Sequence, residues 1–129
     1  MIRTAIVGTG GIAGVCHVPA LRAQAHRAEI VAAVDVDALR AEEFAAGHGI
    51  PAVHTDLHTM LREQRPDVVH LCTPPFLHAE QAVACLEAGA WVWCEKPVAL
   101  SLAELDRVEA AEGPAFAGAV FQHRYGSGA

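Results

Sequence analysis

The sequence contains no apolar run of the roughly 18–20 residues that a helix needs to cross a bilayer. It also shows no charged leader followed by an apolar segment and a cleavage site, because residues 1–4 lead directly into a strand-like segment. Basic clusters are missing too, and 9 basic against 15 acidic residues give a net charge of −6. These absences favour a cytoplasmic protein with neither a nucleic acid nor a membrane as its partner.

Cysteine pairs of the Cys-x-x-Cys type are absent as well. No histidines and cysteines recur together at a spacing that suits zinc. We therefore expect no metal site. Widely spaced cysteines are typical of reduced side chains in the core of a cytosolic protein, and we expect this of Cys16, Cys72, Cys85 and Cys94.

Lysine is nearly absent, because eight of the nine basic residues are arginines and Lys96 is the single lysine. Arginine stays protonated in proteins, whereas burial lowers the pKa of a lysine ammonium group toward neutrality. A lysine retained in an arginine-rich chain suggests a position where a proton must be given up or taken.

The 129 residues, 53% of them apolar, suffice for one domain with a single core. Helical segments separate the apolar segments, which is typical of βαβ units and a mainly parallel sheet. We predict an α/β fold with a doubly wound, mainly parallel six-stranded sheet in the strand order of dinucleotide-binding (Rossmann) domains. The expected strands are residues 2–7, 29–34, 52–55, 68–72, 91–94 and 115–121.

Helix boundaries are predicted from capping residues. Asp37, Asp56 and Ser101 stand where N-caps belong, and Ser101 opens the capping-box pattern Ser-Leu-Ala-Glu. The apolar spacing of the last helix predicts that its inner face consists of Leu102, Leu105 and Val108.

A glycine-rich turn, Gly8-x-Gly10-x-x-Ala13, follows the first predicted strand and opens a helix. Gly8 permits the tight turn and Gly10 permits close approach to a pyrophosphate, which free N–H groups near Gly11 and Ile12 would bind. Such a turn also occurs without any ligand, so its context matters.

Asp35 supplies that context, since it ends the second predicted strand 21 residues after Gly14. Its carboxylate would accept hydrogen bonds from ribose hydroxyls and repel a 2′-phosphate. The pattern therefore predicts NAD as cofactor, with NADP less favoured.

The tripeptide Glu95-Lys96-Pro97 ends the fifth predicted strand. Ligands of open α/β sheets bind outside the carboxyl ends of the strands. Lys96 is therefore predicted to face the cofactor crevice as a proton donor or acceptor, although a strand-end ion pair is an equally bland explanation of the tripeptide alone.

Together these motifs resemble the Gfo/Idh/MocA family of oxidoreductases, named after glucose–fructose oxidoreductase and inositol dehydrogenase. The resemblance runs from the glycine turn and Asp35 through Thr73-Pro74-Pro75-Phe76-Leu77-His78 to Ala88–Pro97. It implies that Gly8, Gly10 and Ile12 contact the pyrophosphate and Asp35 the adenosine ribose. It further implies contacts along the nicotinamide half from Thr73, Pro74, His78 and Glu95, with Lys96 as the catalytic lysine.

Members of that family are two to three times longer and carry a second domain for substrate binding and dimerisation. We therefore expect residues 1–123 to form the dinucleotide-binding domain and residues 124–129 to begin a linker. His123 and Arg124 would lie at the rim and touch a small-molecule substrate, and a cis bond is expected before Pro97. Family members are usually homo-oligomers, but the sequence leaves the state of this chain open.

Three functions remain open at this stage. The chain is an NAD(P)-dependent oxidoreductase acting on a sugar, polyol or similar hydroxyl compound, or a truncated module that binds a dinucleotide without catalysis. The third possibility keeps the family but uses transient oxidation to drive elimination or glycoside cleavage.

Overall fold

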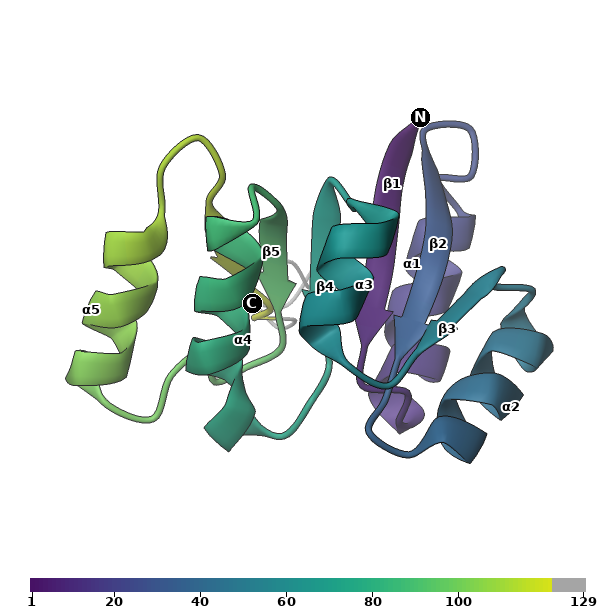
Figure 1. Ribbon diagram of the computed structural model, residues 1–129, viewed down its shortest axis with the longest axis horizontal. Coiled ribbons are helices and arrows are strands. Elements are labelled where there is room, and N and C mark those ends of the chain that lie inside the picture. Colours follow the sequence, from purple (N-terminus) through teal and green to yellow (C-terminus); the bar gives the residue numbers. More distant parts are fainter. Residues whose placement is uncertain (122–129) are drawn as a thin grey trace, which may run out of the picture.

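The computed structural model describes residues 1–121, which form a single six-stranded sheet between two layers of helices (Figure 1). Neighbouring strands all pair in parallel, in the order β3-β2-β1-β4-β5-β6. This order confirms the predicted doubly wound Rossmann architecture. The strands are β1 (Ile2–Val7), β2 (Ala28–Val34), β3 (Ala52–His54), β4 (Val68–Leu71), β5 (Trp91–Cys94) and β6 (Ala117–Ala119).

The helices begin close to the predicted capping residues. The side chains of Asp37, Asp56 and Ser101 each accept a hydrogen bond from the backbone N–H three residues later, which satisfies one of the open donors of a first turn. The helices are α1 (Val18–Arg22), α2 (Ala38–His48), α3 (Leu57–Gln64), α4 (Pro75–Glu87) and α5 (Leu102–Ala111).

The first helical segment differs from a regular α-helix. It opens with a π-helical turn, η1 (Ala13–His17), in which the N–H of Val18 donates to the carbonyl of Ala13. Such turns hold one residue more than an α-turn and are frequent at functional sites. Among residues 1–121, none of the helices combines the length and the apolar character that crossing a bilayer requires.

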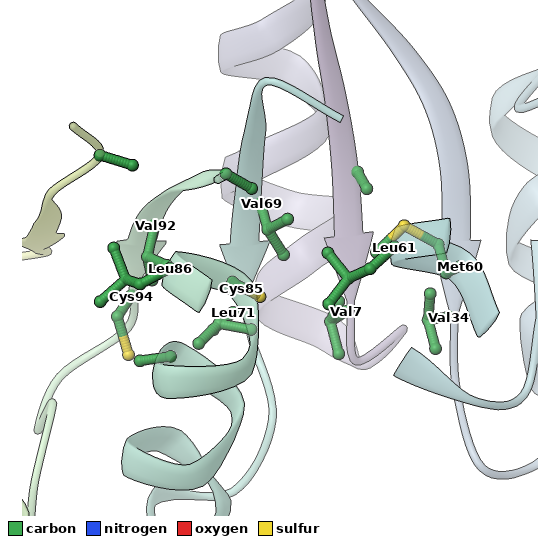
Figure 2. Close-up of a cluster of buried hydrophobic side chains, with 14 of the residues drawn as sticks. Val7, Val34, Met60, Leu61, Val69, Leu71, Cys85, Leu86, Val92 and Cys94 are labelled. Carbon is green, nitrogen blue, oxygen red and sulfur yellow. The ribbon is translucent and has the colours of Figure 1, made fainter. Parts of the chain in front are cut away.

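The sheet separates two apolar cores. Successive side chains of a strand point to opposite faces, so Ile6 joins the core under η1, α1 and α2 while Ala5 and Val7 join the larger core under α3, α4 and α5. Figure 1 shows α3 and α4 in front of the sheet and α1 behind it. In Figure 2, Met60 and Leu61 of α3 lie beside strand side chains of this larger core.

The prediction for the inner face of α5 is wrong at two of three positions. Val108 is 3% exposed, but Leu102 and Leu105 are 79% and 44% exposed. The helix packs against α4 at the end of the molecule, so only one line of its side chains meets the core. The last strand is also shorter than predicted, since only Ala117–Ala119 pair with β5.

The cysteine prediction holds for two residues. Cys85 and Cys94 are buried, whereas Cys72 is half-buried and Cys16 is exposed on η1. Burial, followed by the nearby charged groups, raises the pKa of Cys85 and Cys94 to about 12, so both are protonated thiols at neutral pH. Cys16 is therefore a surface residue and not part of the core.

Candidate dinucleotide site

The candidate site lies where β1 and β4 stand side by side and their following helices depart to opposite faces of the sheet. At such a switch point the loops after the two strands separate and leave a crevice. A cleft of about 570 Å³ opens there, which falls within the usual size of ligand pockets. Its walls come from the ends of β1, β2 and β4 and from the starts of α2, α3 and α4.

Gly8 occupies the tightest point of the site. Its φ is +90°, a conformation that residues with a Cβ rarely adopt. A Cβ on Gly8 would also lie 2.8 Å from the backbone carbonyl carbon and oxygen of Cys72. The loops after β1 and β4 therefore touch through their backbones, and only glycine fits at this position.

The turn that follows is open toward the solvent. Gly11 and Ile12 are exposed, and Ile12 already has helical dihedral angles. The N–H groups in the first turn of a helix have no carbonyl partner within that helix, so they are available to an anion. Nothing lies within 4 Å of a Cβ built on Gly11.

Gly14 has a different role from the other glycines of the turn. A Cβ there would meet the rings of His48 and Phe44 on α2 at 3.4–3.6 Å. Ala13 beside it is fully buried against β1 and β2. The small pair Ala13-Gly14 thus allows η1 to pack closely on both the sheet and α2, which the sequence predicted for the sheet alone.

Asp35 stands at the end of β2 with both carboxylate oxygens turned into the chain. Oδ2 accepts hydrogen bonds from the backbone N–H and the hydroxyl of Thr9, at 3.1 and 2.8 Å, and Oδ1 accepts one from the N–H of Asp37 at 3.0 Å. Burial alone would raise the pKa of Asp35, but these hydrogen bonds and the nearby Arg40 guanidinium together lower it below its usual value. Asp35 is therefore an anion at neutral pH.

Arg40 is a site residue that the sequence reading missed. Its Nη2 lies 3.9 Å from Asp35 Oδ2 and 3.6 Å from the position of a Cβ on Gly10. The signal was present, because a basic residue in the first turn of the helix after Asp35 faces back toward the glycine turn.

The loop after β4 is tied to the loop after β5 by His78. This side chain is 0% exposed, and its ring nitrogens lie 2.7 Å from the carbonyl oxygens of Thr73 and Pro97. Thr73 also donates its hydroxyl to Gln81 on α4. A buried ring with both nitrogens engaged offers no free atom to a ligand, so His78 braces the site from beneath.

The Glu95-Lys96-Pro97 segment leaves β5 at the same edge of the sheet. The bond before Pro97 is cis, which confirms that expectation. Lys96 is exposed, so the burial expected for its ammonium group is absent from this structure. Glu95 is mostly buried, and its Oε1 lies 2.7 Å from Nε2 of His17 on η1.

Two predicted substrate contacts, His123 and Arg124, lie outside the described residues 1–121. Within those residues, no three His, Cys, Asp or Glu side chains gather in a way that would hold a metal ion.

Comparisons with known proteins agree with this geometry. A family model described as an oxidoreductase family with an NAD-binding Rossmann fold matches residues 2–114. Inositol 2-dehydrogenase 1 of Saccharopolyspora erythraea is 37% identical over 112 residues, which cover 86% of this chain and 33% of that protein. The 4-carboxy-2-hydroxymuconate-6-semialdehyde dehydrogenase of Sphingobium sp. is 39% identical over 107 residues, or 83% of this chain and 33% of that protein.

Among solved structures, the WlbA dehydrogenase of Bordetella pertussis, in complex with NADH and UDP-GlcNAcA, superposes with a TM-score of 0.90. It is 29% identical, and the match covers 98% of this chain and 38% of that one. The chain thus spans about a third of the length of the curated relatives that it matches.

Proposed function

The chain belongs to the Gfo/Idh/MocA oxidoreductase family, and we propose that it is the NAD-binding part of an enzyme that oxidises a sugar, polyol or similar hydroxyl compound. In this proposal residues 1–123 form the dinucleotide-binding domain and residues 124–129 begin the connection to a substrate domain. The supporting observation is the cleft at the switch point, which brings the glycine turn and the Asp35 carboxylate together.

The described residues suit a dinucleotide. The open first turn at Gly10, Gly11 and Ile12 would receive the pyrophosphate through backbone N–H groups. The ionised carboxylate of Asp35 retains lone pairs for the hydroxyls of the adenosine ribose. Thr73 and Pro74 would line the path toward the nicotinamide, with His78 holding their loop in place.

Cofactor choice depends on Asp35 and Arg40 acting together. The Arg40 guanidinium would attract a 2′-phosphate, but it lies near the Asp35 carboxylate, which would repel that phosphate. We therefore propose NAD over NADP. Asp35→Ala is expected to weaken NADH binding and to improve NADPH binding relative to NADH, measured by nicotinamide fluorescence titration. Equal affinity of the unaltered chain for both cofactors would contradict the assignment.

The proposed chemistry divides between cofactor and protein. When bound, the nicotinamide ring supplies the hydride acceptor or donor. Lys96 would take the hydroxyl proton as the substrate carbon loses its hydride, and would return it in the reverse direction. Glu95 would receive ribose hydroxyls next to that lysine.

The test combines turnover with binding. The chain is incubated with NAD and a panel of inositols, glucosides and nucleotide sugars while reduced nicotinamide is followed by its absorbance. If turnover occurs, Lys96→Arg should abolish it and leave NADH affinity nearly unchanged. A loss of NADH binding with turnover intact would reject Lys96 as the proton-transfer residue.

The chain length favours an alternative, since about two thirds of each relative has no counterpart here. In that case the chain is a dinucleotide-binding module that needs a further domain or subunit for catalysis. Tight NADH binding without turnover on the whole panel would select this alternative. If turnover is found, analysis of the products separates net oxidation from transient oxidation that ends in elimination or glycoside cleavage.

A further inference from the structure

Three side chains from different elements form a hydrogen-bonded row beneath the candidate site. Nε2 of His17, on η1, lies 2.7 Å from Oε1 of Glu95, which follows β5. Nδ1 of His17 lies 2.9 Å from Nδ1 of His70, on β4. The side chains of His17 and Glu95 are 5% and 15% exposed, so water competes little for these contacts.

The row determines where the protons reside. A carboxylate oxygen only accepts, so Nε2 of His17 carries a proton and donates it to Glu95. The two facing Nδ1 atoms share one proton, because two lone pairs or two N–H groups would repel each other. Burial, followed by the charge of His17, lowers the pKa of His70 to about 4, so His70 is neutral near pH 7.

Neutral His17 then has a single arrangement that satisfies every atom. Its Nε2–H donates to Glu95 and its Nδ1 accepts from Nδ1–H of His70. His70 thereby selects the tautomer of His17 that Glu95 requires. A ring that is fixed at both nitrogens also fixes the carboxylate that it touches.

The position of this row relates it to the proposed chemistry. Glu95 directly precedes Lys96, and Pro97 on the other side of Lys96 is held by His78 through its carbonyl oxygen. The segment that carries the proposed proton-transfer lysine is therefore anchored on both sides by buried histidines. The anchor on the Glu95 side depends on the extra residue of η1, which belongs to the glycine-turn helix.

We propose that His17 is a positioning residue that, with its tautomer set by His70, holds the Glu95 carboxylate in place to receive the ribose hydroxyls of a bound dinucleotide. The proposal rests on the proposed function for its ligand, but not for the hydrogen-bonded row itself.

The row is tested without any ligand by nitrogen NMR of the histidine rings, at a pH above the ordinary histidine range. We expect His17 as the Nε2–H tautomer and His70 as the less common Nδ1–H tautomer. His70→Leu should release His17 from that single tautomer. A His17 ring protonated at Nδ1 alone in the unaltered chain would overturn the row, whatever the chain binds.

The effect on the ligand is tested by NADH titration of His17→Leu and His17→Gln. Loss of a hydrogen bond to a charged group is expected to weaken NADH binding roughly tenfold in His17→Leu, whereas the glutamine amide restores much of it by donating to Glu95. His26→Leu, at an exposed position outside the site, is the matched control and should bind as the unaltered chain does.

A double-mutant cycle separates positioning from packing. If His17 acts through Glu95, then His17→Leu should add little to the effect of Glu95→Gln, since both remove the same contact. Additive losses would overturn the positioning role and leave His17 as a packing residue. If the unaltered chain binds no NADH while the tautomers are as expected, the proposed function fails and the row stands; the ribose role of Glu95 is then rejected with the function.

Discussion

Gly8 is the residue at which the site tolerates least change. Its positive φ and the 2.8 Å approach to the Cys72 backbone act at the same atom, so a methyl group would meet both strain and a steric clash. Gly8→Ala is expected to lower the free energy of unfolding by about 3 kcal/mol or more, measured by urea denaturation.

Gly11→Ala is the matched control for that experiment. Nothing lies within 4 Å of its Cβ and its φ is not positive, so the stability should change by no more than about 0.5 kcal/mol. A Gly8→Ala variant as stable as Gly11→Ala would show that the loops after β1 and β4 are not in backbone contact.

Asp35 predicts a particular response to acid. Because the pKa of Asp35 is lowered in the folded chain, the ionised group stabilises the fold above its unfolded pKa of about 3.9. That stabilisation is lost as the pH falls through the lower, folded value. Asp35→Asn should therefore be less stable than the unaltered chain at neutral pH, with a difference that shrinks below about pH 4.

Urea denaturation at neutral and acid pH measures this difference, with the exposed Asp106→Asn as control. A gap between Asp35→Asn and the unaltered chain that stays constant over the whole pH range would contradict the assigned role of the carboxylate.

At the scale of the element, the end of α3 carries a strained residue. Arg65 caps this helix in the left-handed conformation, with φ of 46°, where glycine is usual. Arg65→Gly is expected to stabilise the chain by up to about 1 kcal/mol in thermal or urea denaturation. The same change at Arg62, inside the last turn, should destabilise by about 1 kcal/mol, and equal effects at both positions would reject the strain.

Helix α5 shows why apolar spacing alone misassigns a face. Val108→Ala should cost about 1–3 kcal/mol, because the side chain is 3% exposed and packs in the larger core. Leu102→Ala should change stability by less than about 0.5 kcal/mol, since its side chain is 79% exposed. Urea denaturation of the two variants would refute this picture if Leu102 proved the costlier loss.

Local chemistry determined which features of the elements were predictable. Asp37, Asp56 and Ser101 were predictable as caps because their bonds span three residues. The inner face of α5 was not, because it depends on how far the core extends beneath the helix. The shortened β6 was not either, since its pairing depends on β5, more than twenty residues earlier.

At the scale of the whole molecule, the strand order and the location of the site followed from the alternation of elements and the handedness of crossovers. The row of His17, His70 and Glu95 did not, because its members are 53 and 78 residues apart. Their contact depends on one additional residue in η1, which nothing in the spacing of the glycine turn reveals.

The whole molecule also leaves part of one sheet face bare. A groove over β4, β5 and β6 is lined by Val68, His70, Trp91, Trp93 and Phe116, and no helix among residues 1–121 belongs to the apolar core on that side of these strands. Trp91 and Phe116 are about half exposed and their rings lie 5.4 Å apart.

An apolar face of this kind should bind a hydrophobic dye. We expect the chain to enhance the fluorescence of anilinonaphthalene sulfonate, and the double variant Trp91→Gln, Phe116→Gln to lose most of that signal. Leu102→Gln, an exposed leucine on the opposite layer, serves as control. Unchanged dye binding in the double variant would place the bare face elsewhere.

The π-helical turn has a consequence for insertions and deletions. Each residue of a helix rotates the next by about 100°, so deleting the exposed Val15 would turn η1 into an ordinary α-turn and swing His17 away from Glu95. The composition of the glycine turn would survive such a deletion, while the row beneath the site would not. Homologous chains that differ by one residue between the second glycine and this histidine would therefore share the nucleotide motif yet need another partner for the glutamate.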